Sequence, residues 1–194
     1  MPRSTTIAVT TAMLTGMVLS SAASALEVEH IETRYAAGQY HCELVAVLDA
    51  PAHAVEDVLR DYEHYPALDP RILQARVLAR PAQGTVLLET HLRTCFGPFC
   101  RTVVRIETVR EAQHALSAVT DPARSDVRFG ETQTTLEPAN AARTRITYRS
   151  SVTPGFWIPA VVGRRWMLRA MEQAALDVFR GVEARAKAPR EIDK

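Results

Sequence analysis

The stretch TVLLETHLRTCFGPFCRTVVRIETVR, residues 85–110, joins two alternating segments through a Gly-Pro turn. In the first segment the apolar residues Val86, Leu88 and Leu92 occupy alternate positions, with Glu89 and His91 between them. Successive side chains of a strand point to opposite faces, so this pattern predicts a half-buried strand. The short turn leads into a second segment of the same kind, which predicts an antiparallel hairpin with one covered and one wet face.

The same alternation recurs along most of the chain. It covers residues 40–48 and 72–152, and turn sequences such as Gln83-Gly84 and Asp121-Pro122 divide the second stretch. Because short connections join antiparallel neighbours, we expect one antiparallel sheet of seven strands, at residues 40–48, 72–80, 85–94, 101–110, 114–120, 128–136 and 144–152.

Helical spacing appears in two places. After Pro51, which suits a first helical turn, Val55, Val58 and Leu59 recur at helical intervals, so two short helices are expected after the first strand. A long amphipathic helix is expected from about residue 160 to 186, with Leu168, Met171 and further apolar residues along one stripe. The sheet is the only large apolar surface that can cover this stripe, which indicates an α+β fold.

Several local stretches occur in a telling order: APAHAV at residues 50–55, VLRDY at 58–62, Tyr65-Pro66, Phe129-Gly130, and FWIP at 156–159 before the long helix. In this order they resemble the START-related helix-grip superfamily, which includes polyketide cyclases/dehydrases, aromatases, coenzyme Q-binding proteins and lipid-transfer domains. The resemblance spans residues 40–185. It implies a bent seven-stranded sheet wrapped around the C-terminal helix, with a cavity between them for a lipid, a polyketide or another apolar molecule.

The expected function is therefore to bind or carry a hydrophobic small molecule or lipid. An apolar ligand would be buried against side chains on the inward faces of sheet and helix. The predicted ligand-binding residues are Tyr40, Leu44, Leu88, Leu92, Val104, Tyr148, Trp157, Met167 and Met171. We expect a START-like ligand-binding domain at residues 40–187, preceded by a lead-in at 26–39 and followed by a tail at 188–194.

Two other classes of function remain open. A polyketide cyclase, aromatase or dehydratase would use polar groups inside the same cavity, but no His, Asp or Glu is assigned to an inward face and no catalytic residue is predicted. An interaction module would offer a wide apolar groove to a partner's peptide or helix. The six histidines have no metal-ligand spacing, and no cofactor motif occurs, so we expect neither a metal nor a cofactor.

The N-terminus reads as a secretory signal peptide over residues 1–25. One basic residue, Arg3, precedes an uncharged and mostly apolar run, and Ala23-Ser24-Ala25 fits the small-residue cleavage pattern. The run is too short for a membrane-spanning helix. We therefore expect an exported, periplasmic protein. With 23 basic and 22 acidic residues, the chain shows no sign of binding nucleic acid.

The three cysteines are interpreted in that compartment. If the segments around the Gly-Pro turn form a hairpin, Cys95 and Cys100 face each other across the strand ends, as a disulfide requires. Cys42 lies on the apolar side of the first strand and is expected to be a buried free thiol, with intermolecular pairing left open.

Aromatic residues flank two expected loops. Phe96 and Phe99 border the Gly-Pro turn, and Phe156 and Trp157 precede the long helix, whose first turns carry several arginines. Aromatic and basic residues together suit a lipid interface, so transient membrane contact through these four residues is one hypothesis. Packing of the same rings against the core is the other.

Overall fold

The computed structural model describes residues 26–96, 99–158 and 163–188. The expected signal peptide and most of the expected tail lie outside the described residues.

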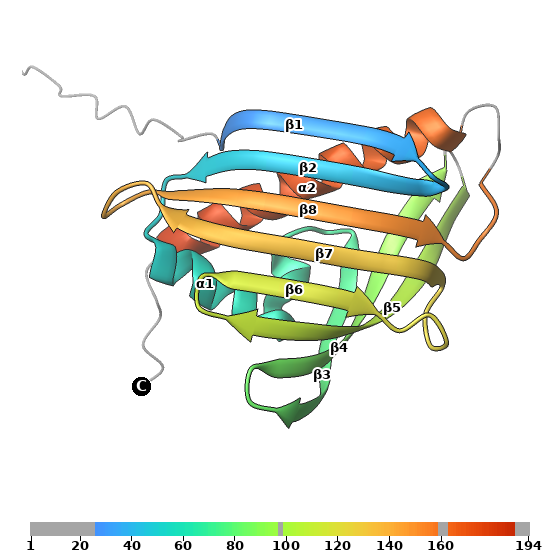
Figure 1. The fold of residues 1–194 in the computed structure, drawn as a ribbon, viewed down its shortest axis with the longest axis horizontal. Helices are drawn as coiled ribbons and strands as arrows, with labels where there is room; N and C mark the ends of the chain where they lie inside the picture. Colours follow the sequence, from blue (N-terminus) through green and yellow to red (C-terminus); the bar gives the residue numbers. More distant parts are fainter. Residues whose placement is uncertain (1–25, 97–98, 159–162, 189–194) are drawn as a thin grey trace, which may run out of the picture.

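An antiparallel sheet of eight strands forms the body of the protein (Figure 1). Its strands follow the order β1-β2-β8-β7-β6-β5-β4-β3, so β1 and β3 are the two edges. Their bounds are β1 Glu27–Ala36, β2 Gln39–Leu48, β3 Ile72–Ala82, β4 Thr85–Phe96, β5 Phe99–Ala112, β6 Ala115–Thr120, β7 Val127–Pro138 and β8 Thr144–Pro154.

The expected antiparallel α+β architecture is confirmed, with one correction to the strand count. Residues 26–39, expected only as a lead-in, contain strand β1, which pairs with β2. β1 escaped prediction because it is a mostly exposed edge strand whose charged side chains occupy both faces, so it has no apolar alternation.

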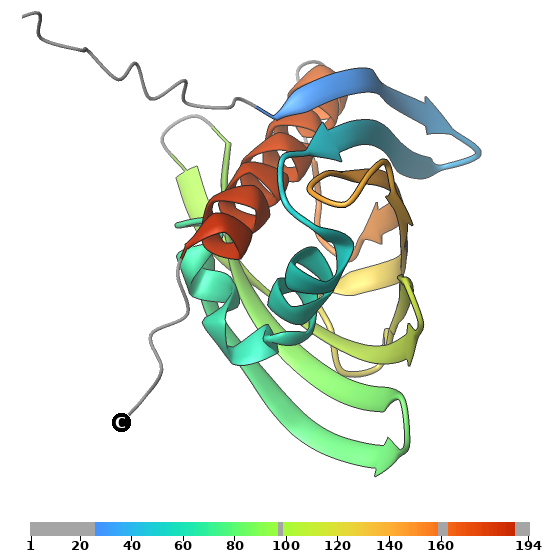
Figure 2. The ribbon, with the colours of Figure 1, turned by 90° about the vertical axis from the view of Figure 1, so that its left-hand side faces the viewer.

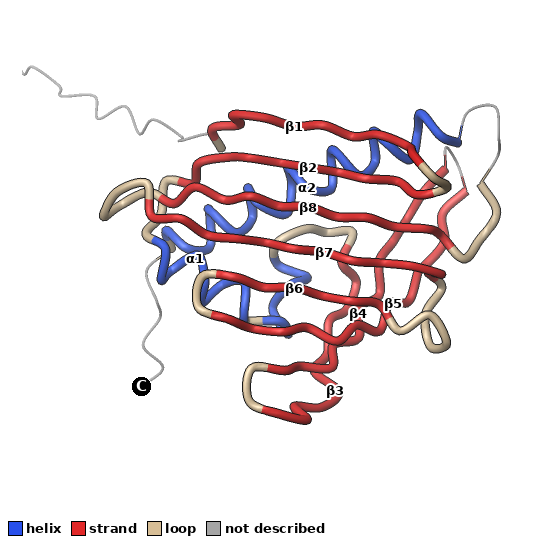
Figure 3. Tube along the Cα trace, in the orientation of Figure 1, coloured by secondary structure: helices blue, strands red, loops and turns tan. Residues whose placement is uncertain are grey.

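Three helices lie on the inner side of the sheet: α1 at Ala52–Arg60, the 3-10 helix η1 at Tyr62–Ala67, and the long α2 at Gly163–Lys187. Figure 2 shows the sheet bending around α2, with α1 and η1 near one end of it. In Figure 3 the long helix α2, in blue, passes behind the red strands β2, β8 and β7. This is the expected helix-grip arrangement, in which the sheet holds the helix against its concave face.

The main apolar core fills the end of this grip where α1 and the C-terminal half of α2 meet β2 and β8. Leu44, Leu48, Val55, Ile146 and Val182 are fully buried there. Burying such side chains contributes about 1.5–3 kcal/mol each. This core fixes the C-terminal half of α2, while the opposite half of the helix faces the site described below.

An ion-pair cluster ties the segment between η1 and β3 to α2. The buried carboxylate of Asp69 accepts two-pronged hydrogen bonds from Arg71, and Arg71 also donates to Asp177 of α2 at 2.9 Å. The hydrogen bonds to Asp69 and its negative charge raise the pKa of Arg71, so the guanidinium stays charged.

Among the described helices, none is long and apolar enough to cross a membrane.

Candidate ligand-binding cavity

A cavity of about 520 Å³ lies between the concave face of the sheet and the N-terminal half of α2. Inward residues of strands β3 to β8 form its floor, η1 closes one side, and α2 forms the roof. Most of its wall is apolar, with Ile72, Leu88, Val103, Val109, Leu116, Met167, Met171 and Val178 among the lining residues. A volume of this size is typical of pockets for small organic ligands.

Five of the nine predicted ligand-binding residues line this cavity. Leu88 and Leu92 come from β4, Tyr148 from β8, and Met167 and Met171 from α2. The Tyr148 ring packs edge-on against Phe179 of α2, with centroids 5.4 Å apart. Burial raises the pKa of the Tyr148 phenol, and a hydrogen bond with Ser150 partly offsets this increase, so the hydroxyl stays protonated.

Two predicted residues are buried but lie outside the cavity lining. Leu44 is completely buried in the main core beneath the C-terminal half of α2. Tyr40 packs against the ring of Tyr35, 4.7 Å between centroids, and Arg164 of α2 stacks on that same Tyr35 ring at 4.4 Å. Tyr40 therefore helps to hold the start of α2 against the β1–β2 hairpin, and burial raises its pKa.

The last two predicted residues, Val104 and Trp157, do not line the cavity, and in each case the preceding residue does. Val103, and not Val104, lines the cavity, because the inward positions of β5 are the odd-numbered ones. Trp157 is 81% exposed, whereas the preceding Phe156 lines the cavity beneath Arg101, whose guanidinium stacks on its ring at 4.4 Å. Adjacent residues of a strand point in opposite directions, so at Val104 an error of one position reverses the side chain.

Two charged residues lie on the cavity floor, although the sequence patterns predicted no acidic residue on an inward face. Arg105 and Glu107, two positions apart on β5, both line the cavity and form an ion pair. Their side chains are only 21% and 8% exposed. Glu107 also accepts a hydrogen bond from the Thr120 hydroxyl at 3.2 Å.

One sequence signal would have found them. Cross-strand partners share a face of the sheet, and Cys95 opposite Cys100 fixes the register of the whole β4–β5 hairpin. Continued along the strands, this register places Val103 opposite Leu92 and Arg105 opposite Thr90. The expected disulfide thus already implied that Arg105 faces inward and that Val104 does not.

Two tyrosines of η1 complete the polar part of the wall. Tyr62 donates a hydrogen bond to Glu111 at 2.6 Å, and Tyr65 donates to the Leu59 carbonyl at 2.6 Å. Burial raises the pKa of both phenols; the hydrogen bond to Glu111 adds to this effect at Tyr62, and nearby negative charge adds to it at Tyr65. Both hydroxyl protons are thus donated to protein acceptors.

Cys42 is a buried free thiol and lines the cavity from β2. Burial, with smaller contributions from Glu172 and Glu43, raises its pKa to about 11. A thiol of this kind is protonated near neutral pH and behaves as a small apolar group. No cluster that could hold a metal ion occurs among residues 26–96, 99–158 and 163–188.

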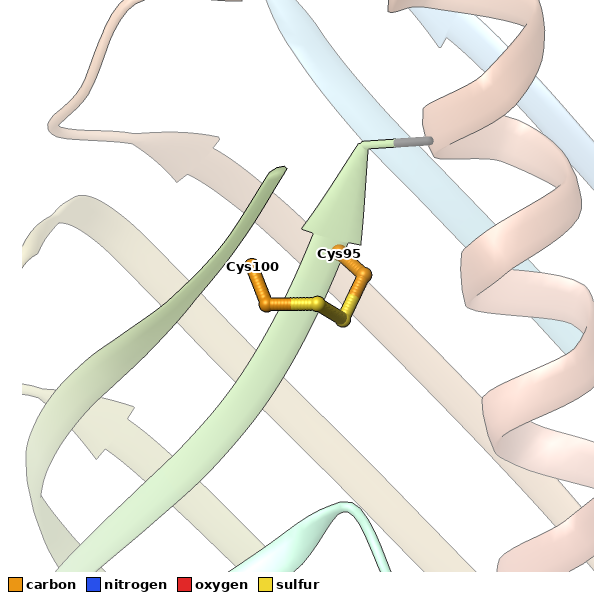
Figure 4. Close-up of a disulfide and its surroundings, with 2 residues drawn as sticks. All are labelled: Cys95 and Cys100. Carbon is orange, nitrogen blue, oxygen red and sulfur yellow. A yellow bond between two sulfur atoms is a disulfide. The ribbon is translucent and has the colours of Figure 1, made fainter. Parts of the chain in front are cut away.

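One end of the cavity, which we call the rim, lies where the β4–β5 hairpin, the end of β8 and the start of α2 converge. Arg93, Cys95, Phe156 and Trp166 line the cavity at this end. The predicted disulfide between Cys95 and Cys100 is confirmed and links the two strands just before their turn (Figure 4).

The aromatic residues proposed for membrane contact differ in how exposed they are at the rim. Phe156 is half-buried and Trp157 is exposed. The backbones of Phe96 and Phe99 pair at the end of the hairpin, but their side chains, and the turn between them, lie outside the described part of the structure.

A bent antiparallel sheet gripping a C-terminal helix around an apolar cavity defines the START-like class of ligand-binding domains. The family described as "Polyketide cyclase / dehydrase and lipid transport" matches residues 39–182. The chain belongs to this family. No curated protein matches it significantly.

Solved structures with the same fold include both cyclases and lipid-transfer proteins. The Zhui aromatase/cyclase from Streptomyces sp. R1128 is 15% identical with a TM-score of 0.64, covering 77% of this chain and 94% of its own. A STAR-related lipid transfer protein from Xanthomonas axonopodis is 16% identical with a TM-score of 0.63, covering 85% and 100%. Human STARD10 is 15% identical with a TM-score of 0.55, covering 80% and 72%. At these identities the similarity establishes the fold.

Proposed function

We propose that the protein is exported to the periplasm and carries a hydrophobic small molecule or lipid in its cavity. The observation behind this proposal is the apolar space of about 520 Å³ between sheet and α2, in a chain whose family includes lipid transport. The driving force is removal of apolar ligand surface from water, about 0.8 kcal/mol for each buried methylene. Methionines in the roof give a wall that adapts to different ligand shapes.

A chain-length series tests this role. For uncharged probes that differ only in alkyl length, each added methylene is expected to tighten binding about fourfold until the cavity is full. Displacement of an environment-sensitive apolar dye measures these affinities. Affinities that do not change with chain length contradict burial in the cavity.

A cavity-filling substitution locates the binding. Ala174 lines the cavity from α2, so Ala174→Phe is expected to weaken binding at least tenfold by occupying ligand volume. Ala184→Phe is the matched control, because Ala184 is exposed on the same helix. If both variants bind as wild type does, the ligand lies elsewhere.

Export is supported by the N-terminal sequence pattern and by the Cys95–Cys100 disulfide, since disulfides persist in oxidising compartments. Transient contact with a membrane surface during loading is the further part of the proposal. In its support, Trp157 is 81% exposed next to the rim, and Arg164 and Arg165 are exposed in the first turn of α2.

Liposome flotation tests the membrane part. Wild type is expected to float with anionic vesicles more than with neutral ones, and Trp157→Ala is expected to reduce this fraction. Val119→Ala is the control, because Val119 is a 53% exposed apolar residue on the convex face, away from the rim. Absence of wild-type protein from the floated fraction would end this part of the proposal.

The second candidate function is a cyclase or dehydratase activity in the same cavity. It is favoured by one observation: Arg105, Glu107 and Tyr148 all line a mostly apolar pocket, as general acid–base chemistry requires. Recovery of the bound molecule after incubation distinguishes the two candidates. A carrier returns it with unchanged mass, whereas a dehydratase or a cyclase that eliminates water returns it lighter by one water.

A further inference from the structure

The two edges of the sheet differ in how open they are to a further strand. β3 has three shifts in its pairing with β4 and contains Pro81, and such features protect an edge from further pairing. β1 has one shift, between Val28 and His30, and is then regular as far as Ala36. No described strand pairs with the outer edge of β1. The backbone N–H and C=O groups along this edge can therefore accept another strand.

The side chains of this regular segment of β1 form two distinct rows. Ile31, Thr33 and Tyr35 lie on the inner side of the sheet, because their pairing partners on β2 are buried residues. Tyr35 is nevertheless 38% exposed, since no further strand covers it. Glu32 and Arg34 lie on the outer side, and both side chains are more than half exposed. The open edge thus presents a mostly apolar row on one face and a charged row on the other.

The same segment is complementary to a second copy of itself that runs antiparallel to it and is centred on Thr33. In this register Glu32 lies opposite the partner's Arg34, and Arg34 lies opposite the partner's Glu32. On the inner face Ile31 lies opposite the partner's Tyr35, and the two copies of Thr33 lie opposite each other. Opposite charges, an aromatic beside a β-branched residue, and two threonines are all cross-strand pairs that stabilise a sheet.

The charges also disfavour the neighbouring registers. A shift by two residues keeps the faces aligned, but it places Glu32 opposite the partner's Glu32, or Arg34 opposite the partner's Arg34. A shift by one residue places charged side chains on the apolar face. Within the chain, Glu32 and Arg34 are 4.0 Å apart and exposed, so this weak contact leaves both charges available to a partner. The order of residues along the edge therefore selects one register.

We propose that two copies of the protein associate through β1, in the antiparallel register centred on Thr33, so that their two sheets become continuous. This inference does not depend on the ligand-carrying function. Arg164, at the start of α2, stacks on the ring of Tyr35, so the interface lies beside the helix that forms the cavity roof. One pair of strands is small by the standard of stable interfaces. We therefore expect a reversible dimer with a dissociation constant in the micromolar range.

Sedimentation equilibrium over a wide range of protein concentration tests the dimer and its register. Glu32→Arg and Arg34→Glu each place like charges opposite each other at two points of the interface, so each is expected to weaken dimerisation at least about tenfold. The double variant Glu32→Arg with Arg34→Glu restores opposite charges and is expected to recover dimerisation. Arg110→Glu is the control for the change in net charge, because Arg110 is exposed on β5, away from β1.

A mixture of the two single variants separates a loss of pairing from a loss of folding. The Glu32→Arg chain carries two arginines on this edge, and the Arg34→Glu chain carries two glutamates. Each is repelled by its own copy and attracted by the other, so the mixture is expected to form heterodimers. A misfolded variant would not recover association on mixing.

Hydrogen exchange of the wild type provides a measurement that needs no variant. Backbone amides of residues 30–36 are expected to exchange more slowly at high protein concentration, because the partner strand then accepts their hydrogen bonds. A wild-type protein that stays monomeric up to millimolar concentration would overturn the inference and leave the edge to a different partner. A dimer that neither single variant weakens, or exchange of this segment that does not depend on concentration, would place the interface elsewhere and overturn it as well.

Discussion

Gly181 of α2 lies directly against the backbone of Leu68: a Cβ atom on Gly181 would sit 2.2 Å from the Leu68 carbonyl oxygen. Leu68 follows η1, whose tyrosines form one side of the cavity. This contact therefore sets how closely the η1 segment approaches the helix that forms the roof.

Gly181→Ala is expected to destabilise the protein by about 1–3 kcal/mol, because backbone must move to admit the methyl group. The direction of the change in unfolding free energy is diagnostic, since the same substitution in an unconstrained helix interior stabilises a protein by about 0.5–1 kcal/mol. Urea unfolding measures the difference, with Ala184→Gly as a control for helix propensity. A Gly181→Ala protein at least as stable as wild type would contradict the close contact.

Arg71→Met is expected to destabilise the protein by about 1–3 kcal/mol, because it leaves the buried carboxylate of Asp69 without its ion-pair partner. Asp69→Asn in the same chain is expected to recover part of this loss. Arg180→Met is the control, since Arg180 forms only an exposed pair with Asp177. If Arg71→Met and Arg180→Met unfold at the same denaturant concentration, the cluster does not support the fold.

The cysteines make a prediction for the protein as it is isolated from its native host. After denaturation without reductant, alkylation is expected to modify one thiol, Cys42, and after reduction all three, as read by intact mass. The same spectrum tests the expected cleavage after Ala25, which gives a chain beginning at Leu26. Three reactive thiols before reduction would contradict the disulfide, and a mass that includes residues 1–25 would contradict cleavage.

The native Cys42 thiol has its own pH dependence. Only the thiolate reacts with alkylating reagents, and burial raises the pKa of Cys42 to about 11. The alkylation rate of the folded protein is therefore expected to rise about tenfold for each pH unit from 7 to 10, without a plateau. A plateau near pH 9 would mean that the thiol is solvated, contrary to its position in the cavity wall.

The sequence predicted those parts of the fold that bury one face. In β4 the alternate positions Val86, Leu88 and Thr90 form the buried side of the strand, and α2 was located by its apolar stripe. The edge strand β1 was missed because it buries almost nothing. Hydrophobic patterning detects burial, and an exposed edge is held by backbone hydrogen bonds that any sequence provides.

The site was predicted only where register was unambiguous. Val103 and Val104 are adjacent and equally apolar, so the pattern alone does not show which of them faces the cavity. Only the pairing of Cys95 with Cys100, which sets the strand register, identifies Val103 as the inward residue. The inward Arg105 and Glu107 violate the pattern that identifies an inward face. Such violations are expected where a protein binds something, and they cannot be recognised until the register is known.

The most direct test of the central claim is native mass spectrometry of the protein purified gently from its native host, with Ala174→Phe beside it. The account predicts one small apolar molecule per wild-type chain, released by solvent extraction and reduced in Ala174→Phe. A wild-type protein that carries no adduct as isolated, and gains none when mixed with apolar ketone and alkane probes, would contradict a ligand-carrying cavity.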